Sequence, residues 1–90
     1  MWIVTELYQF QTTRFVCNTP WRQWWHLLTE VYEIAKALLR GDLQHAMTES
    51  WDASQSLETL RHIGEGLGAD ISMARDEVVR NNTDRGYYVR

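Results

Sequence analysis

Residues 19–63 decide the fold, and they read TPWRQWWHLLTEVYEIAKALLRGDLQHAMTESWDASQSLETLRHI. Thr19 followed by Pro20 is typical of a helix start, because the threonine side chain can accept a first-turn backbone N–H and proline has no N–H to leave unpaired. After this start, apolar residues recur every three or four positions: Leu27, Leu28, Val31, Ile34, Ala35, Leu38 and Leu39. This spacing predicts a helix that begins at Pro20 and stops near Gly41.

A second helix follows after a very short connection. Gly41 can adopt the positive φ of a helix C-terminus, and Asp42 can cap the helix that comes next. Apolar and small residues then recur at helical spacing from about residue 43 to residue 63: Leu43, Ala46, Met47, Ser50, Ala53, Ser54, Leu57 and Leu60. The pattern predicts two helices of roughly 20 residues that form an antiparallel hairpin.

The flanking segments predict shorter helices. Gly64, Gly66 and Gly68 are poor helix-interior residues, so residues 64–69 are expected to form a turn, after which Asp70 caps a helix over 71–82. Near-helical spacing ahead of the hairpin predicts a helix over 3–15, although several β-branched residues weaken that pattern. No run alternates as a strand does, so we expect an all-α fold and a single domain spanning residues 1–90.

Length and composition suggest self-association. A chain of 90 residues buries only about 60 to 65% of its unfolded surface, and its single cysteine excludes an internal disulfide. Five tryptophans and four tyrosines add a large apolar surface. We therefore expect a homo-oligomer, either a dimer or a tetramer, in which two hairpins form a four-helix bundle.

Charge and hydropathy exclude several classes of partner. The formal net charge is −3, which does not favour nucleic-acid binding, and no apolar run approaches the 18 residues of a membrane span. The N-terminal residues lack the basic and apolar regions of an export signal, so we expect a cytoplasmic protein. Cys17 is interpreted as a small buried apolar residue, since no activating base is recognisable beside it.

Two acidic pairs are the candidate chemistry of the chain. Glu30 and Glu33 are three residues apart, as are Glu49 and Asp52, and each pair lies beside the apolar stripe of its helix. Residues three apart share one side of a helix, so each pair can converge on a common ion. Oxygen ligands alone favour Mg²⁺, or Mn²⁺, over zinc. The alternative is that both pairs belong to a solvated helix surface, where acidic pairs are common.

The sequence spacing of the histidines gives no further support for a metal site. A di-iron bundle requires Glu-x-x-His pairs, and neither acidic pair has a histidine in that place. His26, His45 and His62 show no convergent ligand spacing and are interpreted as surface or packing residues.

Glu30-x-x-Glu33, fifteen intervening residues and Glu49-x-x-Asp52 on consecutive helices resemble the motif of the MazG-like all-α nucleoside triphosphate pyrophosphohydrolases. The tail RNNTDRGYY, residues 80–88, is similar to the basic, Asn-containing end of that family. The resemblance extends over about residues 10–88.

The resemblance implies an enzyme that cleaves a (deoxy)nucleoside triphosphate between the α and β phosphates with Mg²⁺, in the housecleaning of nucleotide pools. The four motif carboxylates carry over as the metal ligands and catalytic groups. The expected substrate contacts are Arg85, Arg80 and Lys36 for the phosphates, Asn82 in the same tail, and Phe10, Gln11 and Arg14 for the base. For Lys36 the alternative is a solvated helix terminus. The base and sugar preference, the number of ions, the general base and any stacking by tryptophan remain open.

The chain also departs from the family pattern at two positions. Thr29 stands where many members have a glutamate directly before the first motif glutamate, and Val78 stands where many have a lysine four residues before the tail asparagine. These departures favour an alternative function, a non-catalytic helical module for interaction or regulation that has lost the activity.

Overall fold

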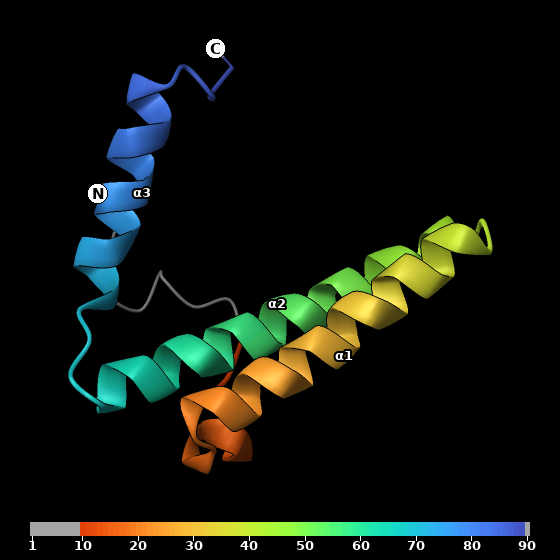
Figure 1. Cartoon of the computed structure of the whole chain (residues 1–90), viewed down its shortest axis with the longest axis horizontal. Helices are drawn as coiled ribbons and strands as arrows, with labels where there is room; N and C mark the ends of the chain where they lie inside the picture. The colour runs from red at the N-terminus through yellow and green to blue at the C-terminus, as the bar shows by residue number, and fades with distance from the viewer. Residues whose placement is uncertain (1–9, 90) are drawn as a thin grey trace.

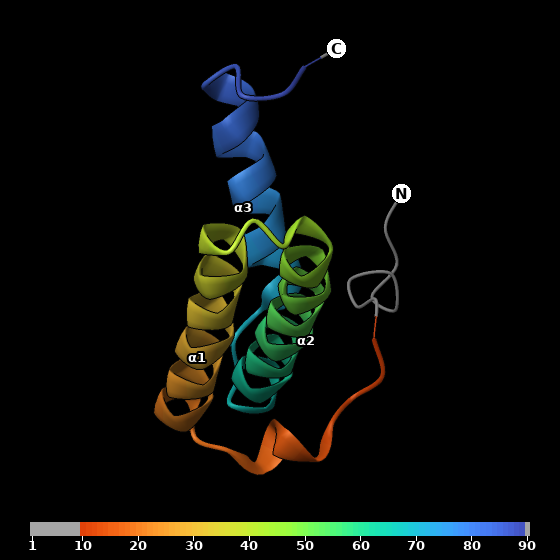
Figure 2. The ribbon, with the colours of Figure 1, turned by 90° about the vertical axis from the view of Figure 1, so that its right-hand side faces the viewer.

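The computed structural model describes residues 10–89, and within them every regular element is helical. A short 3-10 helix, η2 (Arg14–Cys17), precedes three α-helices, α1 (Pro20–Leu39), α2 (Leu43–Gly66) and α3 (Ile71–Asp84). The helices α1 and α2 lie side by side and antiparallel, and α3 rises from the C-terminal end of α2 at a steep angle to them (Figures 1 and 2). The predicted all-α class and the helical hairpin are confirmed.

The helix ends follow the expected capping chemistry. The Thr19 side chain accepts the N–H of Arg22 at 3.2 Å, and the Asp42 side chain accepts the N–H of His45 at 3.1 Å. Between the two helices, Gly41 has φ +74°, a conformation that favours glycine because it has no Cβ. The Gly41 conformation and the Asp42 cap fix the turn and bring α2 back along α1, whereas the Thr19 cap fixes the start of α1.

The core lies between α1 and α2 and consists largely of small residues. Its buried apolar members are Leu27, Ala37, Ala46, Ala53 and Ile63. Gln23 is only 1% exposed, and its Nε2 donates to the carbonyl of Ser56 at 3.0 Å while its Oε1 accepts from Asn18 at 3.2 Å. The buried amide is therefore satisfied, and it fixes the register of the two helices.

The segment before the hairpin differs from the expected helix. Residues 1–9 lie outside the described residues, so the expectation is tested only over 10–15, and there it is wrong: residues 10–13 are not helical. Side chains of α2 hold this segment. Glu58 accepts the N–H of Phe10 at 3.0 Å, and the Nε2 of Gln55 donates to the carbonyl of Gln11 at 3.3 Å. These bonds replace those that a helix would make within itself.

Three further expectations need correction. Helix α2 continues through Gly64 to Gly66, three residues beyond the expected end, and α3 continues to Asp84 rather than ending at 82. Two glycines thus do not stop a long helix that is already supported by its neighbour, because their helical cost is only about 1 kcal/mol each. Cys17 is exposed, whereas the sequence indicated burial.

Helix α3 makes few contacts with the rest of the described chain. It begins after Gly68, which has φ +103°, and Asp70 caps it by accepting the N–H of Met73 at 2.9 Å. None of its residues is buried, and apolar side chains such as Val78 and Val79 stay exposed. None of the helices in the described part of the chain combines the length and hydropathy that a bilayer span requires.

Candidate metal centre

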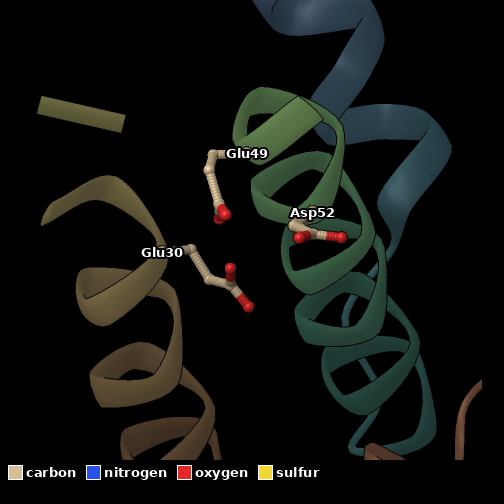
Figure 3. A group of neighbouring side chains, drawn as sticks. All are labelled: Glu30, Glu49 and Asp52. Carbon is tan, nitrogen blue, oxygen red and sulfur yellow. The ribbon is translucent and has the colours of Figure 1, made fainter. Parts of the chain in front are cut away.

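Three motif carboxylates meet across the hairpin. Glu30 extends from α1, and Glu49 and Asp52 extend from α2 (Figure 3). Each residue offers one oxygen, and the three oxygens lie within 4.8 Å of one another. Among the described residues, this is the one group of three or more Asp, Glu, His or Cys side chains that is close enough to share an ion.

The helix geometry explains why these residues meet. Glu49 and Asp52 are separated by about one helical turn and so project from neighbouring positions of α2. The antiparallel hairpin places the middle of α1 opposite this part of α2. The side chains of Glu30 and Glu49 are only 18% and 16% exposed, while Asp52 is exposed. The group therefore lies at the rim of the helix interface, where a ligand can approach it.

Glu30 is held from the core side as well. The Oγ of Ser56, a residue that is 4% exposed, donates to Oε1 of Glu30 at 3.5 Å. The carbonyl of the same serine accepts from Gln23. The buried polar contacts of the core thus extend to one edge of the carboxylate group.

Two histidines flank the group, and the sequence analysis did not include them in the site. Nε2 of His26 lies 3.1 Å from Oε1 of Glu30, and Nε2 of His45 lies 3.4 Å from Oε1 of Glu49. In both pairs the histidine stands four residues before the glutamate. That repeated His-x-x-x-Glu spacing is a signal in the sequence that could have linked the histidines to the site.

The fourth motif carboxylate, Glu33, is not part of the group. Its Oε1 lies 3.9 Å from the Nζ of Lys36, and its side chain is 43% exposed. Lys36 also lies over the ring of Tyr32, with Nζ 5.4 Å from the ring centroid. Glu33 and Lys36 thus form a surface pair on α1, apart from the three converging carboxylates.

The residues expected to contact the base lie around the segment that precedes α1. The ring of Phe10 meets that of Trp51 at a centroid distance of 5.9 Å and an angle of 75°, and Trp51 directly precedes Asp52. Gln11 contributes its carbonyl to Gln55, and the guanidinium of Arg14 lies 5.1 Å from the centroid of Phe15. Of these residues, Phe10 makes an aromatic contact with α2, the helix that carries Glu49 and Asp52.

The residues expected to contact the phosphates are not brought to the carboxylates within one chain. Arg80 and Asn82 belong to α3 and Arg85 follows it, and α3 leaves the hairpin at the far end of α2 (Figure 1). The guanidinium of Arg85 lies 5.7 Å from the ring centroid of Tyr87. Phosphate contacts by these residues therefore require a different arrangement, such as an assembly in which α3 of one chain approaches the carboxylates of another.

Glu58 is a buried carboxylate that the sequence analysis missed. It is 4% exposed and accepts the N–H of Phe10. Its place on α2, between Leu57 and Thr59, gives no sign of burial because the helix presents polar residues on more than one side. Its burial depends on the segment that covers it, and the sequence predicted the conformation of that segment wrongly.

Carboxylate oxygens are the ligands that hard divalent cations prefer, so the donor set of Glu30, Glu49 and Asp52 fits Mg²⁺ or Mn²⁺. Without a cation, three converging negative charges repel one another, and a bound ion would remove that cost.

Comparisons of the chain with protein-family models, with curated proteins and with solved structures found no match.

Proposed function

We propose that the chain is a metal-dependent nucleoside triphosphate pyrophosphohydrolase, which cleaves a (deoxy)nucleoside triphosphate between the α and β phosphates. The products are the monophosphate and pyrophosphate, and the cellular role is the housecleaning of nucleotide pools in the cytoplasm. The observation that carries the proposal is the convergence of Glu30, Glu49 and Asp52 from two facing helices. The same three residues belong to the motif that resembles the MazG-like family.

The proposed ion is Mg²⁺, with Mn²⁺ as the alternative, and Glu30, Glu49 and Asp52 would hold it. Glu33 would join them through a change of its side-chain conformation, since it lies on the same helix as Glu30, three residues further along. When bound, such an ion neutralises charge on the triphosphate and lowers the pKa of a bound water.

The protein residues would supply position and proton transfer. Carboxylates from two facing helices would fix the position of the ion, and through it the position of the phosphates. A glutamate of the group that is not fully used as a ligand would accept the proton of the attacking water. Asp52, the exposed member, lies on the side from which a nucleotide can approach.

A second candidate function is a non-catalytic helical module for interaction or regulation. It is favoured by the large apolar side chains that α1 exposes, Trp21 and Leu39 among them, and by the departures at Thr29 and Val78. A module of this kind would keep the hairpin while its carboxylates perform no chemistry.

A product assay separates the two functions. The purified full chain is incubated with Mg²⁺ or Mn²⁺ and a panel of ribo- and deoxyribonucleoside triphosphates, and pyrophosphate and orthophosphate are measured separately. Pyrophosphate release that is lost in Asp52→Asn and kept in Asp76→Asn supports the enzyme, because Asp76 is a 72% exposed carboxylate on α3. Orthophosphate alone, or no turnover with either ion, would contradict it and favour the interaction module.

A further inference from the structure

Each of the two half-buried glutamates of the metal centre has a histidine beside it on its own helix. His26 reaches Glu30 with a distance of 3.1 Å between Nε2 and Oε1, and His45 reaches Glu49 with a distance of 3.4 Å between the same atoms. The two contacts repeat one spacing, four residues, on both helices of the hairpin.

The antiparallel hairpin turns this repeated spacing into an ordered row of side chains. Because the two helices run in opposite directions, a histidine that precedes its glutamate lies toward opposite ends of the hairpin on α1 and on α2. Figure 3 shows the side chains of Glu30 and Glu49 extending toward one another. Each histidine lies one helical turn before its glutamate on the same helix. The histidine side chains are 45% and 42% exposed, more than twice the values of the glutamates.

The imidazoles flank the group of converging oxygens and do not belong to it. Among the described residues, the potential ligand atoms that lie mutually within 4.8 Å come from Glu30, Glu49 and Asp52, and no histidine nitrogen joins them. Each histidine therefore contacts one carboxylate from outside. A neutral imidazole that carries its proton on Nε2 can donate a hydrogen bond to that carboxylate.

We propose that His26 and His45 are positioning residues of the metal centre, each of which holds one oxygen of its glutamate and leaves the other oxygen for the ion. The inference rests on the proposed metal-dependent function. Groups that orient a ligating side chain in this way contribute strongly to metal affinity, because they remove the freedom that the ligand would otherwise lose on binding.

The two histidines should differ in how much they contribute to metal affinity. Glu30 has a second side-chain donor, since Ser56 donates to the same oxygen at 3.5 Å. Among the described residues, Glu49 has no second side-chain donor of this kind. Loss of His45 should consequently weaken metal binding more than loss of His26.

The test measures binding of Mn²⁺ alone to the full chain, with no nucleotide. Free Mn²⁺ is followed by electron paramagnetic resonance at pH 8. The variants are His26→Ala, His45→Ala, His26→Gln and His45→Gln, with His62→Gln as the control. His62 lies elsewhere on α2, with Nε2 3.5 Å from the Oγ1 of Thr12.

The alanine variants should weaken Mn²⁺ binding about 10- to 100-fold, with the larger effect at position 45, while the His62 variant binds as the wild type does. Glutamine should restore part of the affinity, because its amide can donate to a carboxylate four residues away. Melting of the metal-free proteins checks that each variant folds.

Three results would overturn the inference. Wild-type affinity in both alanine variants would show that the histidines do not position the ligands. Equal losses in the alanine and glutamine variants would show that the amide donor does not replace the imidazole as the positioning role requires. Absence of Mn²⁺ binding in the wild type would overturn the metal centre itself, and with it the proposed function, whereas the first two results leave that function standing.

Discussion

Asp52 is the exposed member of the carboxylate group, and its substitution separates a metal centre from a solvated acidic surface. In Asp52→Asn, one of three converging charges is removed, so the metal-free protein should melt at the same temperature or higher. Mg²⁺ at ten times its Kd should stabilise the wild type by about 1.4 kcal/mol, or several degrees, and the variant should lose most of this shift.

The matched control for this substitution is Asp76→Asn, which removes the same charge from α3. Thermal melts at equal ionic strength and subunit concentration, with and without Mg²⁺, make the comparison. Identical Mg²⁺ shifts in the wild type and in both variants would show that the carboxylates do not form a site.

At the residue scale, the sequence predicted in part which carboxylates lie together. The i,i+3 spacing correctly placed Glu49 and Asp52 on one side of α2, because helix geometry alone determines it. It could not show that Glu33 turns toward Lys36, since both orientations satisfy the same spacing. The contacts of His26 and His45 follow an i,i+4 pattern, which the Glu-x-x-His spacing of a di-iron bundle does not include.

At the scale of elements, the segment before α1 depends on Glu58. This buried carboxylate accepts the N–H of Phe10, whose ring contacts Trp51 beside Asp52. Glu58→Ala removes a charged acceptor, and hydrogen bonds of this type contribute about 1.5 to 3 kcal/mol. The exchange rate of the Phe10 amide hydrogen should therefore rise at least about tenfold.

Hydrogen exchange followed by NMR tests this prediction residue by residue. Glu65→Ala, at an exposed position of the same helix, is the control and should leave the Phe10 amide unchanged. Faster exchange throughout α1 and α2 in Glu58→Ala would mean that the residue supports the whole hairpin rather than this segment. Unchanged exchange at Phe10 would mean that the contact contributes nothing to the segment.

The elements that the sequence predicted well are those whose ends are fixed by local capping and turn residues. Thr19 with Pro20, Gly41 with Asp42, and Asp70 each fix a helix end through bonds within a few residues, and all of these helix starts and the turn are confirmed. The segment over 10–13 was predicted wrongly because its conformation is fixed by residues of α2 more than forty positions away. Local periodicity carries no information on such contacts.

At the scale of the whole molecule, the single chain leaves much of its apolar surface exposed. Trp21, Trp25 and Tyr32 recur along α1 at spacings of four and seven, and each is more than half exposed. A row of large exposed aromatic side chains along one helix is typical of a surface that another protein covers. We therefore expect the protein to be a dimer or a tetramer in solution, in which a second hairpin covers this surface.

Light scattering at low micromolar concentration measures the mass directly. The expected value is at least twice the subunit mass of 10.7 kDa. In Trp25→Glu, a charge is placed in the row without loss of a buried side chain, so the mass should fall toward that of the monomer. A stable wild-type monomer would contradict the prediction.

Association would also account for the position of the tail. Arg85 follows α3, which points away from the carboxylates of its own chain (Figure 1). If the proposed function holds, a phosphate contact by Arg85 then has to come from the other chain of a dimer. In that arrangement Arg85→Ala and Asp52→Asn each impair activity alone, but a mixed dimer contains one site with an intact carboxylate group and an intact Arg85.

Mixing the two variants therefore tests the arrangement without a structure of the assembly. With equal amounts and free exchange of subunits, half of the dimers are mixed and one of their two sites is complete, so about a quarter of the wild-type activity should return. A site built within one chain cannot recover, because neither variant contains a complete set of residues. Activity of the mixture no greater than the mean of the two variants, with exchange verified by differently tagged subunits, would exclude a contribution of Arg85 from the second chain.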